Sequence, residues 1–207
     1  MALALLSSAA CATIGATYTG SGVAVDSELS TRESGWVYVA KVPVVRQRAD
    51  WDCGLAALMM VLRYWSVTPV PGIIAKTLEG AAEMHRPISA GELKKIAKDH
   101  ELEAFVVRGG SKDLIAQMRK GRPVIVGLLK PTIRGRVAHY EVVIGVNERT
   151  GDVMTIDPSL GHRKNTWSGF EAEWTGAGFL ILLVAPRQNA ASVSIKRGRL
   201  DRSGPRT

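Results

Sequence analysis

The apolar positions that follow Cys53 recur at the spacing of a helix. They lie in the stretch CGLAALMMVLRYW and are Leu55, Leu58, Met59, Leu62 and Trp65. Residues three and four positions apart share one face of a helix. The pattern therefore predicts a helix that begins at Cys53 and buries one side.

Two more helices are predicted from the residues at their ends. SAGELKKIAKDH begins with Ser89 and has Glu92 three residues later, as in a capping box, where both side chains accept hydrogen bonds from free backbone N–H groups. In SKDLIAQMRKG, we expect Ser111 as the N-cap and Gly121 as the left-handed residue after the last turn.

The second half of the chain changes to short β-rich runs bounded by Gly and Pro. These are RPVIVGLLK, AHYEVVIGVN, GDVMTIDPS and GFLILLVA, and an earlier run, WVYVAKVPVV, is strand-like as far as Pro43. We expect PTIRGRVAH, around Gly135, to be a loop. Helices followed by strands predict an α+β fold, with an N-terminal helical part packed on one side of a C-terminal antiparallel sheet.

Composition and charge favour one globular domain with tails. The chain has 207 residues, of which 46% are hydrophobic and 22% charged. Residues 187–207 carry six basic residues and one acidic residue, and so hold +5 of the +8 net charge. We interpret them as a basic disordered tail and the domain as residues 39–186. Because the tail has no interleaved aromatic residues for base stacking, we expect no nucleic-acid partner.

The N-terminus has the composition of a targeting segment. Residues 1–25 contain no charge and begin with small and apolar residues. The apolar run is shorter than the about 20 residues that a membrane span needs, but it is typical of an export signal. Ser8-Ala9-Ala10-Cys11 also resembles a lipobox, in which Cys11 would carry a membrane-attaching lipid.

We therefore expect residues 1–25 to be an export signal or a lipoprotein-type leader, followed by a linker at residues 26–38. The protein would then be exported to the bacterial cell envelope or periplasm, with a lipid on Cys11 as a membrane anchor. A plain tail of small residues is the alternative.

Cys53 is a candidate nucleophile because it begins a helix instead of lying within its apolar face. The positive end of the helix favours the thiolate form, and the Cys53 N–H could donate to an oxyanion. Asp52 is placed to N-cap the helix. Cys11 and Cys53 lie in different contexts, so we expect no disulfide framework, and no Cys/His spacing suits zinc.

Three further residues would complete a cysteine-nucleophile site. Gln47, six residues before Cys53, could direct its amide at the reacting carbonyl. His139 and Asp157 lie on strands joined by the turn NERTGD. In an antiparallel hairpin centred there, the two face each other or are diagonal neighbours.

In either register Asp157 would orient His139 and leave its second ring nitrogen for Cys53. Each residue alone also has a structural explanation: a surface Gln, a His that caps a strand and an Asp in a DPS turn. The four residues together favour a catalytic site. We expect His85, His100 and His162 to be surface residues, and Trp51 and Trp174 to line a groove or to pack in the core.

VPVVRQRADWDCGLAALMMVLRYW resembles the cysteine–helix motif of the C39 (bacteriocin-processing, double-glycine) peptidases. GRPVIVGL, HYEVVIGV and VMTIDPSLG resemble that family's later blocks, so that the resemblance covers about residues 40–185. It implies a papain-like cysteine peptidase fold. It also implies that Cys53 is the nucleophile, His139 the base, Asp157 its orienter and Gln47 part of the oxyanion hole.

Members of that family are typically the N-terminal domains of ABC exporters and cut leader peptides after a double glycine. The 207 residues contain no ATPase motif and no membrane span, so we expect a stand-alone C39-like peptidase that acts on peptide or leader-type substrates. We expect no cofactor and no metal. Two alternatives stay open: an acyltransferase that uses the same Cys53 thioester, and a peptide-binding module that does not cut.

Overall fold

The computed structural model describes residues 20–26, 34–84 and 86–187. Its helices and strands, in chain order, are β1 (Val23–Ala24), β2 (Trp36–Tyr38), α2 (Cys53–Tyr64), α3 (Pro71–Glu83), α4 (Ala90–Asp99), β3 (Glu103–Arg108), α5 (Ser111–Arg119), β4 (Val124–Thr132), β5 (Gly135–Asn147), β6 (Val153–Asp157), β7 (Gly161–Asn165), α6 (Trp167–Gly176) and β8 (Leu180–Ala185). The three predicted helices and the four predicted C-terminal strands are all present.

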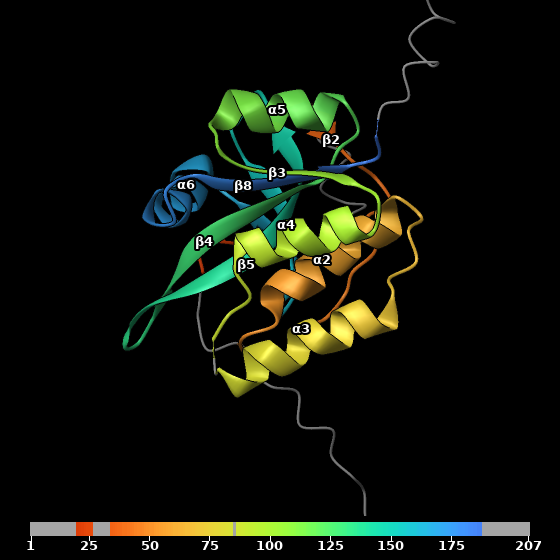
Figure 1. Ribbon diagram of the computed structural model, residues 1–207. Coiled ribbons are helices and arrows are strands. Elements are labelled where there is room, and N and C mark those ends of the chain that lie inside the picture. Colours follow the sequence, from red (N-terminus) through yellow and green to blue (C-terminus); the bar gives the residue numbers. More distant parts are fainter. Residues whose placement is uncertain (1–19, 27–33, 85, 188–207) are drawn as a thin grey trace, which may run out of the picture.

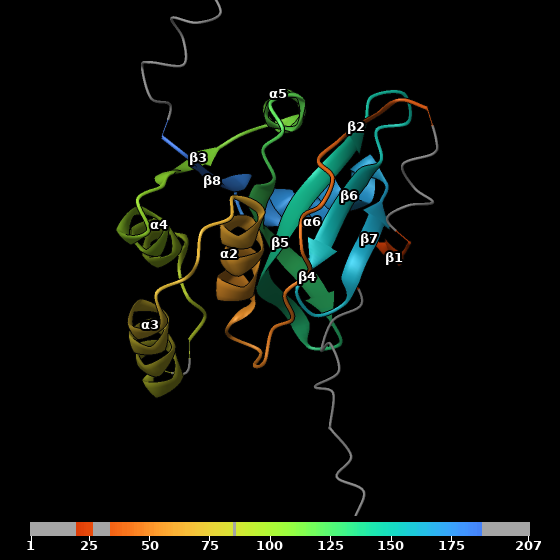
Figure 2. The same ribbon diagram turned by 90° about the vertical axis from the view of Figure 1, so that its right-hand side faces the viewer.

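The strands form one sheet in the order β1-β7-β6-β5-β4-β8-β3, and β2 pairs with β5 outside this path. The sheet can be followed in Figure 1 together with Figure 2, in which β1, β6 and β7 are labelled. Each pairing is antiparallel. Figure 2 shows α2, α3 and α4 together on one side of the strands, and α6 packs against β4. This arrangement confirms the predicted α+β fold.

Helix α2 connects the helical part of the molecule to the sheet, because its buried face packs on β5. The predicted core positions Leu55, Leu58 and Leu62 are 0–4% exposed. Gly54, directly after Cys53, comes very close to β5 and α4: a Cβ atom there would lie 2.9 Å from Cδ2 of Tyr140 on β5 and 3.0 Å from Cδ1 of Leu93 on α4. A glycine at this position therefore allows the first turn of α2 to approach the sheet.

Two of the predicted helix ends are confirmed and one is wrong. Ser89 and Glu92 form the capping box at the start of α4, and Gly121, with φ of +66°, follows α5 in the left-handed conformation. Ser111, however, is the first residue of α5, and Gly110 is its N-cap. The Gly110 N–H donates to Asp113 Oδ2 at 2.8 Å, so a side chain of the first turn binds the backbone of the N-cap residue, and the expected serine cap is absent.

The expected loop around Gly135 is instead a tight hairpin. Strand β4 runs to Thr132, which pairs with Gly135 at the start of β5. Gly135 has a φ of +129°, which glycine adopts without strain, so two residues suffice to reverse the chain. His139 therefore lies within a long strand and not at its beginning.

Several elements were not expected from the sequence. They are α3, α6, β3, β7 and the short β1, whereas WVYVAKVPVV is a strand only over Trp36–Tyr38. The predicted lipidation site Cys11 and the basic tail from residue 188 onward lie outside the described residues. The leader, linker and tail boundaries stay predictions.

Candidate active site

Cys53 is the first residue of α2, and its side chain is buried, at 1% exposed. Asp52 occupies the N-cap position but makes no side-chain hydrogen bond to the helix. Its carboxylate instead accepts from the backbone N–H groups of Arg48, at 3.1 Å, and Ala49, at 3.2 Å. The capping prediction is therefore wrong in detail, because Asp52 organises the loop that leads into Cys53.

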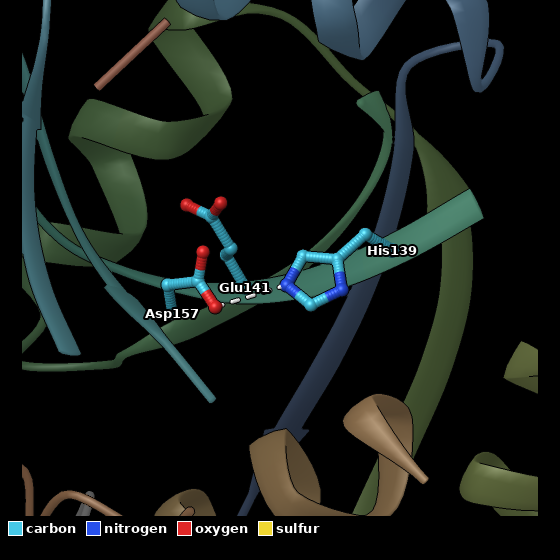
Figure 3. Close-up of side chains that lie close together, drawn as sticks. All are labelled: His139, Glu141 and Asp157. Carbon is cyan, nitrogen blue, oxygen red and sulfur yellow. Dashed lines mark hydrogen bonds and ion pairs between the residues drawn. The ribbon is translucent and has the colours of Figure 1, made fainter. Parts of the chain in front are cut away.

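His139 and Asp157 form a buried pair. Nε2 of His139 lies 3.1 Å from Asp157 Oδ1, and the two residues are 4% and 1% exposed. Val142 pairs with Ile156, so Glu141 is opposite Asp157, and His139 is the diagonal neighbour of Asp157. This is one of the two registers that the hairpin argument allows. Figure 3 shows the second ring nitrogen of His139 turned away from Asp157.

Asp157 is held by its own turn as well as by His139. Its Oδ1 accepts from the N–H groups of Ser159, at 2.7 Å, and Leu160, at 3.2 Å. The same turn accepts hydrogen bonds from the loop before Cys53: Gln47 N donates to Pro158 O at 3.1 Å, and Arg46 Nη1 donates to Ser159 O at 2.6 Å. The loop before the cysteine and the carboxylate turn are thus joined directly.

The Gln47 side chain is half-buried in this loop. Its Nε2 donates to Ala49 O at 3.2 Å. Its Oε1 is buried and has no hydrogen-bond partner among the described residues. An amide nitrogen carries two hydrogens, so one N–H of Gln47 remains for a substrate oxygen. The Cys53 N–H, in the first turn of α2, is a second donor without a partner inside the helix.

The electrostatics of the pair favour a protonated imidazole. Burial by itself would lower the pKa of His139, but hydrogen bonds and charge interactions with Asp157 and Cys53 outweigh it and raise the pKa to about 9. Since Asp157 occupies Nε2, Nδ1 is the nitrogen that remains for the thiol of Cys53. Burial, with the charge of Cys53, also raises the pKa of the neighbouring Tyr140 to about 12.

A buried charge cluster adjoins the pair, and sequence reasoning missed it. One polar side-chain atom from each of His139, Glu141 and Asp157 lies within 4.8 Å of the other two, and Figure 3 shows the three side chains close together. Lys130 Nζ lies 2.5 Å from both Glu141 Oε1 and Glu173 Oε2. A charged residue two positions after His139, inside the apolar run HYEVVIGV, was the signal that could have identified Glu141. The absence of a metal and of a cofactor stays a prediction.

The other histidines and tryptophans divide between correct and wrong expectations. His100 is buried and not on the surface: Val70 N donates to its Nε2 at 2.8 Å, and its Nδ1 bonds Ile96 O at 2.7 Å. His162 is half-buried on β7, where we expected a surface turn. Trp174 is 0% exposed and belongs to the core. Trp51 is half-buried against the core, and His85 lies outside the described residues.

Within residues 20–26, 34–84 and 86–187, no helix combines the length and the apolar character needed to cross a membrane.

Relatives of this chain include two transport/processing ATP-binding proteins. It is 31% identical over 130 residues to the pediocin PA-1 transport/processing ATP-binding protein PedD of Pediococcus acidilactici. That match covers 63% of this chain but only 17% of the relative. A similar protein of Leuconostoc mesenteroides, the mesentericin-Y105 transport/processing ATP-binding protein MesD, is 27% identical over 150 residues, which is 68% of this chain and 19% of that protein.

Solved structures have a similar fold. A double glycine motif protease from an AMS/PCAT transporter, solved in complex with a leader peptide, is 25% identical, with a TM-score of 0.55 over 72% of this chain and 95% of that one. A C39-like peptidase from Bacillus anthracis, 21% identical, shares the fold, with a TM-score of 0.57 over 74% of this chain and 99% of that one. The sequence model of the peptidase C39 family matches residues 41–189. The chain therefore belongs to the peptidase C39 family.

Proposed function

We propose that the protein is a cysteine peptidase in which Cys53, His139, Asp157 and Gln47 carry out the reaction on peptide or leader-type substrates. The observation that carries this proposal is the position of His139. Its Nε2 is bound by Asp157 at 3.1 Å, and its second nitrogen remains for Cys53 at the start of α2.

The geometry suits acylation of the thiol. The Cys53 thiolate attacks the peptide carbonyl carbon and forms a tetrahedral oxyanion, to which the Gln47 amide and the Cys53 N–H donate. The C–N bond then breaks, and the imidazolium of His139 gives its proton to the departing amine. Asp157 holds the ring in place and stabilises its positive charge. Water activated by His139 hydrolyses the thioester and releases the acid.

The substrate class is proposed by likeness to the relatives. The solved double glycine motif protease was bound to a leader peptide. The relatives PedD and MesD are named as transport/processing ATP-binding proteins. We therefore propose that this chain cuts a peptide after a double glycine.

Cleavage of a synthetic peptide tests this directly. The full chain should convert a peptide with an internal Gly-Gly into fragments that separate after the second glycine, as read by mass spectrometry. Cys53→Ala should give no fragments, and Cys11→Ser should cut as the wild type does. Intact peptide with the wild-type chain, bound equally well by Cys53→Ala, would contradict the peptidase and support a binding module.

The same assay distinguishes hydrolysis from acyl transfer. Both routes share the Cys53 thioester and differ in whether water or an amine accepts the acyl group. With an added amine such as glycinamide, a peptidase still yields mainly the free acid. A dominant amide product would identify an acyltransferase.

We also propose that the protein is exported to the bacterial cell envelope and anchored through a lipid on Cys11. The composition of residues 1–25 supports this. Expressed in bacteria, the wild type should be in the membrane fraction with a mature mass that starts at a lipid-modified Cys11, and Cys11→Ser should leave that fraction. An unmodified chain that begins at Met1 would contradict the anchor.

A further inference from the structure

A second group of charged side chains is buried beside the proposed catalytic residues, and the peptidase mechanism does not use it. Lys130, Glu141 and Glu173 are 2%, 0% and 5% exposed. Charged residues are rarely buried this completely, because removal from water costs free energy that only close pairing can offset. Such a cluster next to a reactive histidine needs an explanation.

Lys130 connects the two carboxylates. Its Nζ lies 2.5 Å from Glu141 Oε1 and 2.5 Å from Glu173 Oε2. Burial would lower the pKa of Lys130, but the two carboxylates raise it, so the ammonium form persists. Glu173 is fixed in turn, because its Oε1 accepts from the Ser21 N–H at 2.6 Å.

Glu141 places this cation close to the carboxylate that orients His139. Glu141 and Asp157 are opposite each other on β5 and β6, at the position next to the pair Val142 and Ile156. In Figure 3 the two side chains extend from neighbouring strands, and the Glu141 carboxylate is turned away from the His139 ring. The ammonium that binds Glu141 is thus near a second carboxylate, Asp157, for which it could compete.

We propose that Glu141 is a positioning residue: by binding the Lys130 ammonium, it prevents that cation from competing with His139 for the Asp157 carboxylate. A cation paired with Asp157 would weaken the charge interaction that stabilises the imidazolium and would draw Oδ1 away from Nε2. The inference rests on the proposed function, since it assigns a role within the same site.

Several charged or titratable groups surround His139. They are Cys53 from α2, Glu141 from β5 and Asp157 from β6. Lys130 from β4 binds Glu141 and also Glu173 from α6. Of the two carboxylates that bind Lys130, Glu141 is the one opposite Asp157, so variants of the two glutamates form a matched pair.

The test is the titration of His139 itself, followed by the NMR signal of its imidazole C–H in the full chain and assigned with His139→Gln. In Glu141→Leu, which cannot bind an ammonium, we expect the pKa of His139 to fall by about one unit. Glu141→Gln keeps an acceptor oxygen and should give a smaller shift in the same direction. If the leucine variant does not fold, the glutamine variant carries the test.

Two controls test whether the effect depends on the place of the lost charge and on the Lys130 cation. Glu173→Gln removes the same charge from the cluster but leaves Lys130 bound to Glu141, so the pKa of His139 should change far less. Glu141→Leu combined with Lys130→Met removes the competing cation and should return the pKa towards the wild-type value. Equal shifts in Glu141→Gln and Glu173→Gln, no shift in Glu141→Leu, or no recovery in the double variant would overturn the inference.

The same experiment keeps this inference distinct from the proposed function. A wild-type His139 that titrates near 9, with the titration unchanged in Glu141→Leu, overturns only the role of Glu141. A wild-type His139 that titrates near the ordinary value of about 6.5 removes the Cys–His–Asp arrangement, and the role of Glu141 with it.

Discussion

Individual side chains set the protonation of the site, and His139 is the first of them. Its ring is almost fully buried, which disfavours a positive charge, yet Asp157 and Cys53 raise its pKa to about 9. At neutral pH the imidazole therefore holds the proton that a leaving amine requires. Folding raises this pKa, so the stability that the charged ring contributes is complete below about 6.5 and is lost as the pH rises through 9.

The first prediction concerns pH. Peptidase activity, measured as kcat/KM, should fall above about pH 9, where the imidazolium loses its proton. Asp157→Asn should move this alkaline limb to lower pH, because a neutral amide cannot stabilise the charged ring, and should lower kcat by about 100-fold or more. An unchanged limb in Asp157→Asn would show that Asp157 does not control His139.

The second prediction concerns Gln47. Gln47→Ala should lower kcat by about 100- to 1000-fold with little change in KM, because an oxyanion donor acts mainly in the transition state. Gln117→Ala is a suitable control: Gln117 also has a buried Oε1 without a hydrogen-bond partner among the described residues, but it lies on α5. Equal losses in the two variants would point to stability and not to catalysis.

Elements bring these residues together, and much of that assembly was readable from the sequence. The period of apolar positions after Cys53 correctly gave α2, and the turn NERTGD gave a hairpin that brings His139 and Asp157 within reach. The exact register was not readable, because β5 carries an irregularity between Val143 and Gly145 that shifts the pairing by one residue. The His139 and Asp157 side chains are long enough to meet in either register, so their contact does not depend on that shift.

The third prediction concerns the approach of α2 to the sheet. Gly54→Ala would place a Cβ 2.9 Å from Tyr140 Cδ2, so we expect a loss of about 1–3 kcal/mol in the free energy of unfolding, together with reduced activity from a displaced Cys53. Gly80→Ala is the control. Gly80 lies inside α3, where a Cβ meets nothing within 4 Å, and alanine should stabilise by about 0.5–1 kcal/mol. Urea unfolding measures both, and a similar change of the same sign in both variants would contradict the packing argument.

At the scale of the whole molecule, the sequence predicted the class of the fold, but it did not predict strands β3 and β7 or the burial of His100. Strand β3, with its mostly exposed residues, lacks the alternation that marks a half-buried strand. Strand β7, GHRKN, is polar and is a strand because it pairs with β6. His100 was expected on the surface because it follows the end of a helix, and only in the folded chain does the Val70 N–H donate to its ring. Strand β3 and His100 depend on partners distant in sequence, and β7 depends on a pairing that its own polar residues do not reveal, so local patterns do not encode these features.

The Lys130–Glu141–Glu173 cluster was not foreseen for the same reason. Its members lie on β4, β5 and α6. Only Glu141, inside an apolar run, gives a local sign of burial, and nothing near it in the sequence points to Lys130 or Glu173 as its partners. The four catalytic candidates could be proposed from the sequence, because the chemistry of a thiol nucleophile specifies which residue types to look for.

The measurement that tests the central claim most directly is the rate at which iodoacetamide alkylates Cys53 as a function of pH. It should be made on the full chain carrying Cys11→Ser, so that Cys53 is the one reactive thiol. We expect rapid alkylation that continues at mildly acidic pH, and a large loss of rate there in His139→Ala. His162→Ala, the control, should react as the Cys11→Ser parent does. Alkylation that develops only at alkaline pH and is indifferent to His139 would contradict the Cys53–His139 pair.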